Sequence, residues 1–159
     1  MAQIGGKVYL FTRIGLAALA LIILVTVYRL IAIQEGVDQT YLLPMGFEGC
    51  VVINYNVKGA RPLKIDNNEI VYKVPKSGVL NTSSPSDFGW VNEQHSGGYQ
   101  LRAFYVDGKG NKIKELHQEK IRFGANGAAQ EEGKPERQYS YQIFGSEDIE
   151  NKGCPALDR

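Results

Sequence analysis

The residues of this 159-residue chain that could take part in chemistry are two histidines, two cysteines and a glycine-rich segment that ends in lysine. His95 and His117 are far apart, and neither has a second histidine at the spacing of a zinc site. Gly127 and Gly133 precede Lys134 as in a phosphate-binding loop. However, five residues instead of four separate the glycines, and proline follows the lysine where serine or threonine would bind magnesium. We therefore predict no catalytic residue, no metal site and no cofactor, and a protein that is not an enzyme.

The two cysteines, Cys50 and Cys154, are too few for a disulfide-rich scaffold and do not form a CxxC pair. In an oxidising compartment outside the cytoplasm they could pair with each other. Such a disulfide would close most of the domain into one loop and would stabilise the fold by on the order of 4–5 kcal/mol. The alternative is two free thiols, and the sequence leaves both alternatives open.

A second candidate site is the irregular segment at residues 83–98, which is rich in serine and glycine. It contains the single tryptophan, Trp90, together with Phe88. Exposed aromatic side chains on such a loop could anchor a partner, because aromatic residues often dominate the energy of binding interfaces. The alternative is that Trp90 closes one end of the folded domain. We predict Phe88 and Trp90 as partner-binding residues.

Short runs of alternating apolar and polar residues begin after residue 49, with the two-residue period of strands that bury one face. These runs lie at residues 50–57, 70–74, 99–106 and 139–144. A glycine-bearing turn at 107–111 predicts a hairpin between the third run and the extended residues after it. No segment after residue 34 has an apolar stripe at helical spacing. We therefore predict an all-β fold, with a single β-sandwich domain, such as one of Ig-like type, at residues 41–159.

Most tyrosines of this domain stand on the alternating runs, in phase with the apolar residues. We interpret them as core residues whose hydroxyl groups reach the rim, instead of as a platform for sugar binding. Residues 124–138 have no apolar periodicity. They are expected to form a flexible loop.

The amino-terminal part contains an apolar run of 20 residues at 14–33, with Arg29 as its only charge. As a helix this run would span roughly 30 Å, the thickness of the hydrocarbon core of a bilayer. Leu30, Ile31 and Ile33 stand where the cleavage site of a signal peptide needs small residues. The sequence therefore favours an uncleaved transmembrane helix over a signal peptide, and the lipid bilayer is the partner of residues 14–33.

The charges on either side of this run predict its orientation. Lys7 and Arg13 lie in the leader at residues 1–13, which is expected to be cytoplasmic because basic residues favour that side. Residues 34–40 form a polar linker to an extracytoplasmic domain. The chain after residue 33 carries 15 basic and 17 acidic side chains. Such a balance lacks the basic surface of a nucleic-acid-binding protein, so no nucleic-acid partner is predicted.

Several motifs of the domain resemble an uncharacterised family of small bacterial surface domains, Bacillus-like proteins that are membrane-anchored or lipoproteins. The resemblance is carried by Tyr41-Leu-Leu-Pro-Met-Gly-Phe-Glu-Gly, Val71-Tyr-Lys-Val-Pro-Lys-Ser-Gly-Val-Leu-Asn-Thr, Trp90, Phe104-Tyr-Val-Asp-Gly-Lys-Gly-Asn and Tyr141-Gln-Ile-Phe-Gly. It implies a cell-envelope protein with a prealbumin-like or related β-sandwich, and it implies no activity. Members often attach through a lipid-modified cysteine, whereas this chain has no cysteine in the corresponding place and carries the apolar run instead. The cysteine pair is not part of the resemblance.

Together these features predict a single-pass protein of the cell membrane whose outer domain binds another protein or a cell-wall component. The alternative is a structural or accessory subunit that associates with a larger membrane complex through its transmembrane helix. The two hypotheses place the contact in different parts of the chain, either at Phe88 and Trp90 or within residues 14–33.

Overall fold

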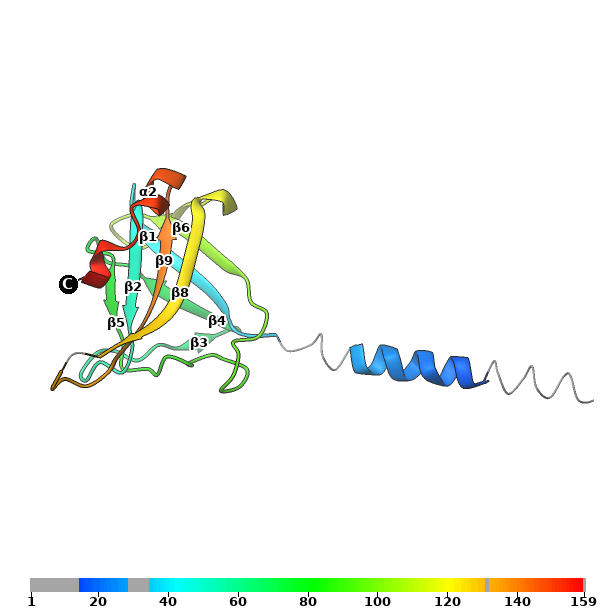
Figure 1. Cartoon of the computed structure of the whole chain (residues 1–159). Helices are drawn as coiled ribbons and strands as arrows, with labels where there is room; N and C mark the ends of the chain where they lie inside the picture. Colours follow the sequence, from blue (N-terminus) through cyan, green and yellow to red (C-terminus); the bar gives the residue numbers. More distant parts are fainter. Residues whose placement is uncertain (1–14, 29–34, 131, 159) are drawn as a thin grey trace, which may run out of the picture. The chain divides into compact units, whose positions relative to one another are not determined.

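The computed structural model describes residues 15–28, 35–130 and 132–158 (Figure 1). The chain divides into two compact units, Met1–Glu35 and Gly36–Arg159. In the first unit, residues 15–28 are helical. Residue 14 and residues 29–33 of the predicted transmembrane helix, and the whole leader, lie outside the described residues. No helix in the described part of the chain combines the length and the hydropathy that crossing a bilayer requires.

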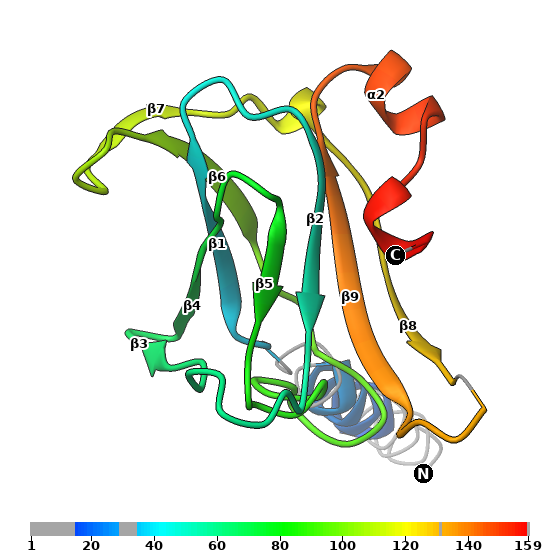
Figure 2. The same cartoon turned by 90° about the vertical axis from the view of Figure 1, so that its left-hand side faces the viewer.

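The described part of the second unit is built mainly from nine strands in two mixed sheets. The arrangement of the two sheets can be followed in Figure 2. The first sheet has the order β3 (Ile65–Asp66), β4 (Glu69–Lys73), β1 (Asp38–Pro44), β6 (Leu101–Val106) and β7 (Lys112–Glu115). The second has the order β5 (Val79–Asn81), β2 (Gly49–Asn54), β9 (Arg137–Phe144) and β8 (Ile121–Ala129). Short helical segments are η1 (Gln118–Lys120), α2 (Glu147–Asn151) and η2 (Pro155–Asp158). The mostly β fold and the hairpin between β6 and β7 are confirmed.

Strand β1 lies at the centre of the five-stranded sheet and pairs in parallel with both β4 and β6. The prediction that residues 34–40 form a linker is wrong from Asp38 onward, because Asp38–Thr40 already belong to β1. Four consecutive residues, Thr40 to Leu43, are buried. A central strand that is covered on both faces shows no alternation of apolar and polar residues, which is why the sequence did not reveal it.

The two sheets share one hydrophobic core. Tyr41 and Leu43 on β1 contribute to it from the first sheet, and Val51 and Phe144 contribute from the second. The ring of Tyr41 lies 5.0 Å from that of Phe144 and 4.8 Å from that of Tyr72, measured between centroids. Tilted aromatic pairs at this spacing are favourable, so Tyr41 joins the two sheets and also joins neighbouring strands within the first.

The prediction of a flexible loop at residues 124–138 is wrong for most of this segment, because strands β8 and β9 occupy both of its ends. Residues 124–129 pair with β9 in an antiparallel ladder, and only residues 130–136 lie between the two strands. The small residues of β8 fit beneath larger side chains of β9. At Gly127 an added Cβ would lie 2.7 Å from the Tyr139 ring, and at Gly124 it would collide with the Gln142 side chain. The absence of apolar periodicity therefore reflects this close packing.

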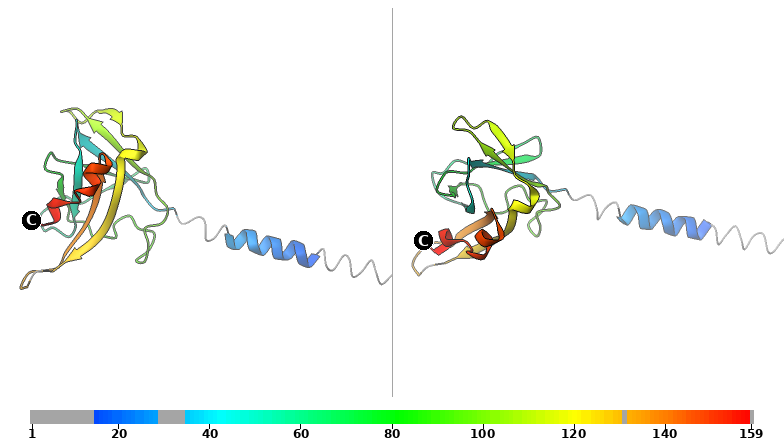
Figure 3. Two further views of the ribbon diagram at one scale, coloured as in Figure 1. Left: turned by 45° about the horizontal axis from the view of Figure 1, so that its top comes forward. Right: turned by 90° about the horizontal axis from the view of Figure 1, so that it is seen from above.

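The chain after β9 lies on the face of the second sheet that points away from the first (Figures 2 and 3). Segment α2 contacts β8 and β9, and η2 contacts β2. Beneath this segment Val52 and Ile143 are buried, although the neighbouring Val51 faces the shared core. The second sheet is therefore covered on both faces.

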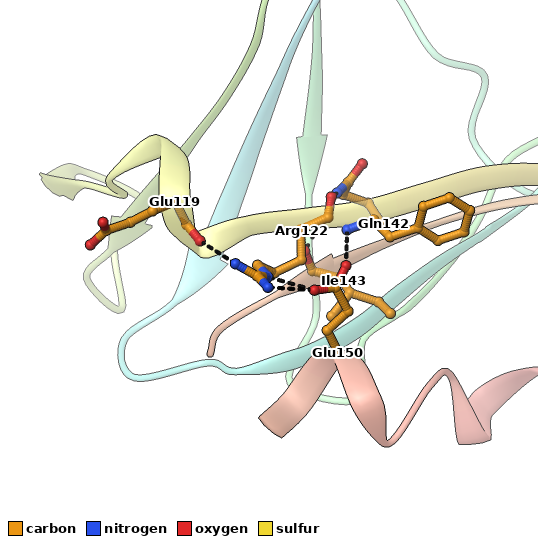
Figure 4. Close-up of polar contacts among 6 residues, drawn as sticks. Glu119, Arg122, Gln142, Ile143 and Glu150 are labelled. Carbon is orange, nitrogen blue, oxygen red and sulfur yellow. Dashed lines mark hydrogen bonds and ion pairs between the residues drawn. The ribbon is translucent and has the colours of Figure 1, made fainter. Parts of the chain in front are cut away.

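Two kinds of contact hold this carboxy-terminal segment. Cys50 and Cys154 form a disulfide, with Cα atoms 5.2 Å apart, so the structure contains the bridge that the sequence left open. Figure 4 shows the second contact, in which Arg122 Nε donates to Glu150 Oε2 at 2.7 Å. The other oxygen of Glu150 accepts the backbone N–H of Phe123 at 3.0 Å. One carboxylate thus ties α2 to both the side chain and the backbone of β8.

Candidate functional site

A cavity of about 130 Å³ lies between the two sheets. Strands β1, β4 and β6 contribute to its wall from the first sheet, and β8 and β9 contribute from the second. The irregular segment between β5 and β6 completes the wall. The aromatic residues Tyr41, Tyr55, Tyr72, Phe88, Trp90 and Tyr99 line it, together with neutral polar residues that include Gln39, Ser86, Asn126, Ser140 and Gln142.

The parallel register of the first sheet places two of the tyrosines side by side. Tyr41 on β1 is directly opposite Tyr72 on β4, and both side chains are buried, with exposed fractions of 4% and 3%. For Tyr72 the interpretation as a core residue is confirmed, whereas for Tyr99, which is 42% exposed, it is wrong. Tyr41 and Tyr72 also line the cavity, which the sequence analysis did not anticipate.

The tyrosines of β9 lie on the opposite face from the one predicted. Directly opposite residues of an antiparallel pair point to the same side of the sheet, and Tyr141 is opposite Val52, which lies beneath the carboxy-terminal segment. Ser140 is opposite Ile53, a residue of the shared core. The inward face of β9 therefore carries polar residues. A polar stripe on an inward face indicates a cavity, but the sequence does not tell which face points inward.

Some polar groups of the cavity are paired within the protein. The hydroxyl groups of Tyr55 and Ser140 are hydrogen-bonded at 2.9 Å. Gln142 Nε2 donates to the carbonyl oxygen of Arg122 at 2.6 Å (Figure 4). Ser86 donates from its hydroxyl to the side-chain oxygen of Gln138 at 3.0 Å. These bonds fix the positions of three wall residues from β9 and from the segment before β6.

Other polar groups of the wall have no partner among the described residues. The hydroxyl of Tyr41 makes no hydrogen bond there, although its residue is only 4% exposed. The indole N–H of Trp90 and the side-chain amides of Gln39 and Asn126 are also without a hydrogen bond to the described part of the chain. None of these groups is fully buried, so they are available to water or to a ligand.

The wall of the cavity is electrically neutral. Among the described residues that line it, none is a lysine, an arginine, an aspartate or a glutamate. Burial raises the pKa of Tyr41, Tyr55 and Tyr72, because the phenolate form would lose its hydration. These three phenols therefore remain protonated across the physiological range of pH.

The two aromatic residues that the sequence singled out both line the cavity. Phe88 also packs against the core. Between them Gly89 has a φ of +84°, and a Cβ there would lie 2.8 Å from Cδ1 of Ile70. Only glycine fits this left-handed conformation and this close approach without strain, so Gly89 allows the segment to lie against β4. Their role as partner-binding residues stays a prediction.

The remaining candidates lie outside this site. Cys50 and Cys154 form the disulfide on the outer face of the second sheet. His95 Nε2 is 2.9 Å from the side-chain nitrogen of Asn92, and His117 is exposed beside η1. Neither histidine lines the cavity.

Comparison with known proteins relates the domain to others by sequence and by fold. A family model, described as a family of unknown function (DUF6843), matches residues 35–153. A comparison with curated proteins found no match. A crystal structure of a Bacillus anthracis protein, named provisionally as a lipoprotein, aligns with a TM-score of 0.57 and 22% identity. The alignment covers 70% of this chain and 71% of that chain, and at this identity it establishes a likeness of fold alone.

Proposed function

The chain belongs to the family of unknown function DUF6843, and we propose that it is a binding protein of the bacterial cell surface. In this proposal residues 14–33 attach it to the cell membrane, with the amino terminus in the cytoplasm. The two-sheet domain, a β-sandwich of prealbumin-like or Ig-like type, lies outside. The domain binds a component of the cell envelope in the cavity between its sheets.

Two observations support an extracytoplasmic position. The Cys50–Cys154 disulfide fits an oxidising compartment, because disulfides are rare in the reducing cytoplasm. The Bacillus anthracis protein that shares the fold is named provisionally as a lipoprotein, a class that is attached to membranes. The hydropathy of residues 14–33 provides the corresponding attachment in this chain.

The observation that carries the binding role is the cavity with its unpaired polar groups. Protein interiors are close-packed, yet the hydroxyl of Tyr41 has no hydrogen-bond partner among the described residues although the residue is only 4% exposed. Folding alone would favour a filled and apolar space between the sheets. A ligand that fills the space and pairs with these groups would account for both features.

The proposed role is binding without catalysis. Covalent catalysis requires a nucleophile beside a base, and acid–base catalysis requires a titratable group with a pKa near the working pH. The described lining offers hydroxyl and amide groups, and the pKa of its buried phenols is raised away from neutrality. The wall therefore suits recognition better than proton transfer.

A photo-crosslinking experiment tests this proposal. The photoreactive residue p-benzoylphenylalanine replaces Tyr99, which lines the cavity and is 42% exposed, in the full chain expressed in bacterial cells. The matched control replaces Ile113 on β7, which is 56% exposed and does not line the cavity. We expect an adduct with an envelope component from position 99 and none from position 113.

The experiment also separates the two hypotheses about the contact. Equal crosslinking from both positions, or none from position 99, would contradict a binding role for the cavity. If a partner is then lost when an unrelated transmembrane helix replaces residues 14–33, the accessory-subunit alternative is supported instead.

A further inference from the structure

We infer that the cavity takes an uncharged, hydroxyl-rich ring of the kind that a neutral sugar unit provides. This inference rests on the proposed binding role of the cavity and specifies the chemical class of its ligand. It follows from the charge of the wall, its unpaired polar groups, its aromatic residues and its size.

The neutral wall selects an uncharged group. A carboxylate, phosphate or ammonium group that entered the cavity would lose its hydration, and no opposite charge on the described wall would compensate for that loss. The phenol groups of Tyr41 and Tyr72 do not supply a negative charge, because burial raises the pKa of both. Charged sugars and charged peptide side chains are therefore disfavoured.

The unpaired groups select a ligand with many hydrogen-bonding positions. A phenol hydroxyl donates and accepts, an indole N–H donates, and a side-chain amide does both. Tyr41 and Gln39 bring these groups from the first sheet, Asn126 from the second sheet, and Trp90 from the segment before β6. An apolar peptide side chain would leave them unpaired, at a cost for each group. Ring hydroxyls, which donate and accept in several directions, would pair with them.

The aromatic residues select a ligand that also has an apolar face. The face of an aromatic ring carries partial negative charge and attracts the weakly positive C–H groups of an aliphatic ring. Trp90, Phe88 and Tyr99 contribute such side chains from the segment that precedes β6. A pyranose combines hydroxyl groups at its edge with C–H groups on its faces, so it matches both kinds of wall.

The size of the cavity corresponds to a single ring. A volume of about 130 Å³ is large enough to hold several water molecules. A sugar ring would displace such waters and reproduce their hydrogen bonds, a replacement that costs little affinity. The cavity would therefore hold one unit of a saccharide, and the rest of the chain would extend outside it.

Calorimetric titration of the full chain in detergent micelles tests the inference. The probes are two neutral tetrasaccharides, N-acetylchitotetraose and maltotetraose, each at up to about 10 mM, which would nearly saturate a site with a Kd near 1 mM. Fully deacetylated chitotetraose, titrated in a mildly acidic buffer alongside the neutral probes, keeps the same rings but carries ammonium groups. A capped alanine tetrapeptide represents a neutral peptide. We expect at least one neutral tetrasaccharide to bind and the other two probes not to bind.

A pair of tyrosine variants locates the binding. Tyr41→Phe removes the unpaired hydroxyl in the cavity, and we expect roughly 2- to 10-fold weaker binding of the saccharide. Tyr105→Phe is the matched control, because its hydroxyl donates to the carbonyl oxygen of Phe47 and the residue does not line the cavity. Its affinity should equal that of the wild type. Tyr41→Phe loses no hydrogen bond to the described residues, so it should fold as the wild type does.

Three results would overturn the inference. These are no binding of either neutral tetrasaccharide, tighter binding of the peptide or the charged saccharide, and an equal effect of the two tyrosine variants. If any of them occurs while position 99 still crosslinks to an envelope component, the sugar inference fails and the binding role remains. If the crosslink is also absent, both fail.

Discussion

Replacing both cysteines by serine, as Cys50→Ser with Cys154→Ser, removes the covalent link between β2 and the segment after α2. The linked residues are separated by 104 positions in the chain. Closing a loop of this length lowers the entropy of the unfolded chain, which raises the free energy of unfolding by about 4.7 kcal/mol at 25 °C. We expect the double variant to lose about 3–5 kcal/mol in the free energy of unfolding.

The structure indicates that this loss arises in the unfolded state. Without the disulfide, Glu150 still accepts hydrogen bonds from Arg122 and from the backbone of β8. Arg137 still donates to the carbonyl oxygen of Leu157 at 3.2 Å. The carboxy-terminal segment therefore keeps noncovalent contacts with the second sheet, and the folded domain should remain intact in the double variant.

Urea unfolding of the full chain in a mild detergent measures the effect. Trp90 is the only tryptophan of the chain, and it lies in the wall between the sheets, so its fluorescence reports the unfolding of this domain. With a urea dependence of about 2 kcal/mol per M, a loss of about 4 kcal/mol lowers the midpoint by about 2 M. Reduced wild-type protein should unfold at the midpoint of the double variant, and reductant should not change the variant.

The loop-closure reasoning would be refuted if the oxidised wild type and the double variant had the same midpoint. It would also be refuted if the variant lost its native fluorescence in the absence of urea while reduced wild type kept it. The second result would mean that the cysteine side chains are needed for packing in the folded state.

Two further predictions concern contacts inside and between the strands. Gly124→Ala should lower the free energy of unfolding by about 1–3 kcal/mol, because the new methyl group would lie 2.8 Å from the backbone oxygen of Tyr141 on β9. Gly98→Ala, with open space at its Cβ, should leave the urea midpoint unchanged. The hydrogen bond from Thr40 lowers the pKa of Glu69 below its ordinary value near 4.5. The bond therefore stabilises the folded state fully above pH 4.5, and this stabilisation is lost as the pH falls through the lowered pKa of Glu69. The free energy of unfolding of the wild type should therefore exceed that of Thr40→Val by about 1 kcal/mol at pH 7. The urea midpoints of the two proteins should converge in acid.

The sequence predicted the strands in which apolar and polar residues alternate, and these include β2 and β9 of the sheet that is covered on both faces. In β4, Ile70 and Tyr72 are buried and Val71 is 39% exposed, so the alternation is visible in the residues themselves. Strands β1 and β8 escaped prediction for two different reasons. The first is covered on both faces, and the second has mainly small residues from position 124 onward, of which Gly124 and Gly127 lie beneath side chains of β9.

The candidate site was predicted in part. Phe88 and Trp90 drew attention because aromatic residues are unusual in a segment of serine and glycine, and the structure brings both to the cavity. Ser140 and Asn126 were not predicted as site residues, because polar residues on a strand or in an expected loop are ordinarily exposed to water. Their position in the cavity wall follows from the register between β8 and β9, which no local pattern specifies.

The composition and local patterns of the chain establish its mostly β domain, its near-neutral charge and its apolar amino-terminal run. These properties depend on residues that are close in sequence, and their periodicity can be read from the chain directly. The pairing of Cys50 with Cys154, the inward face of β9 and the neutral cavity depend on which distant segments cover each sheet. That choice is made by packing between residues up to about a hundred positions apart, which is why it became visible only in the folded domain.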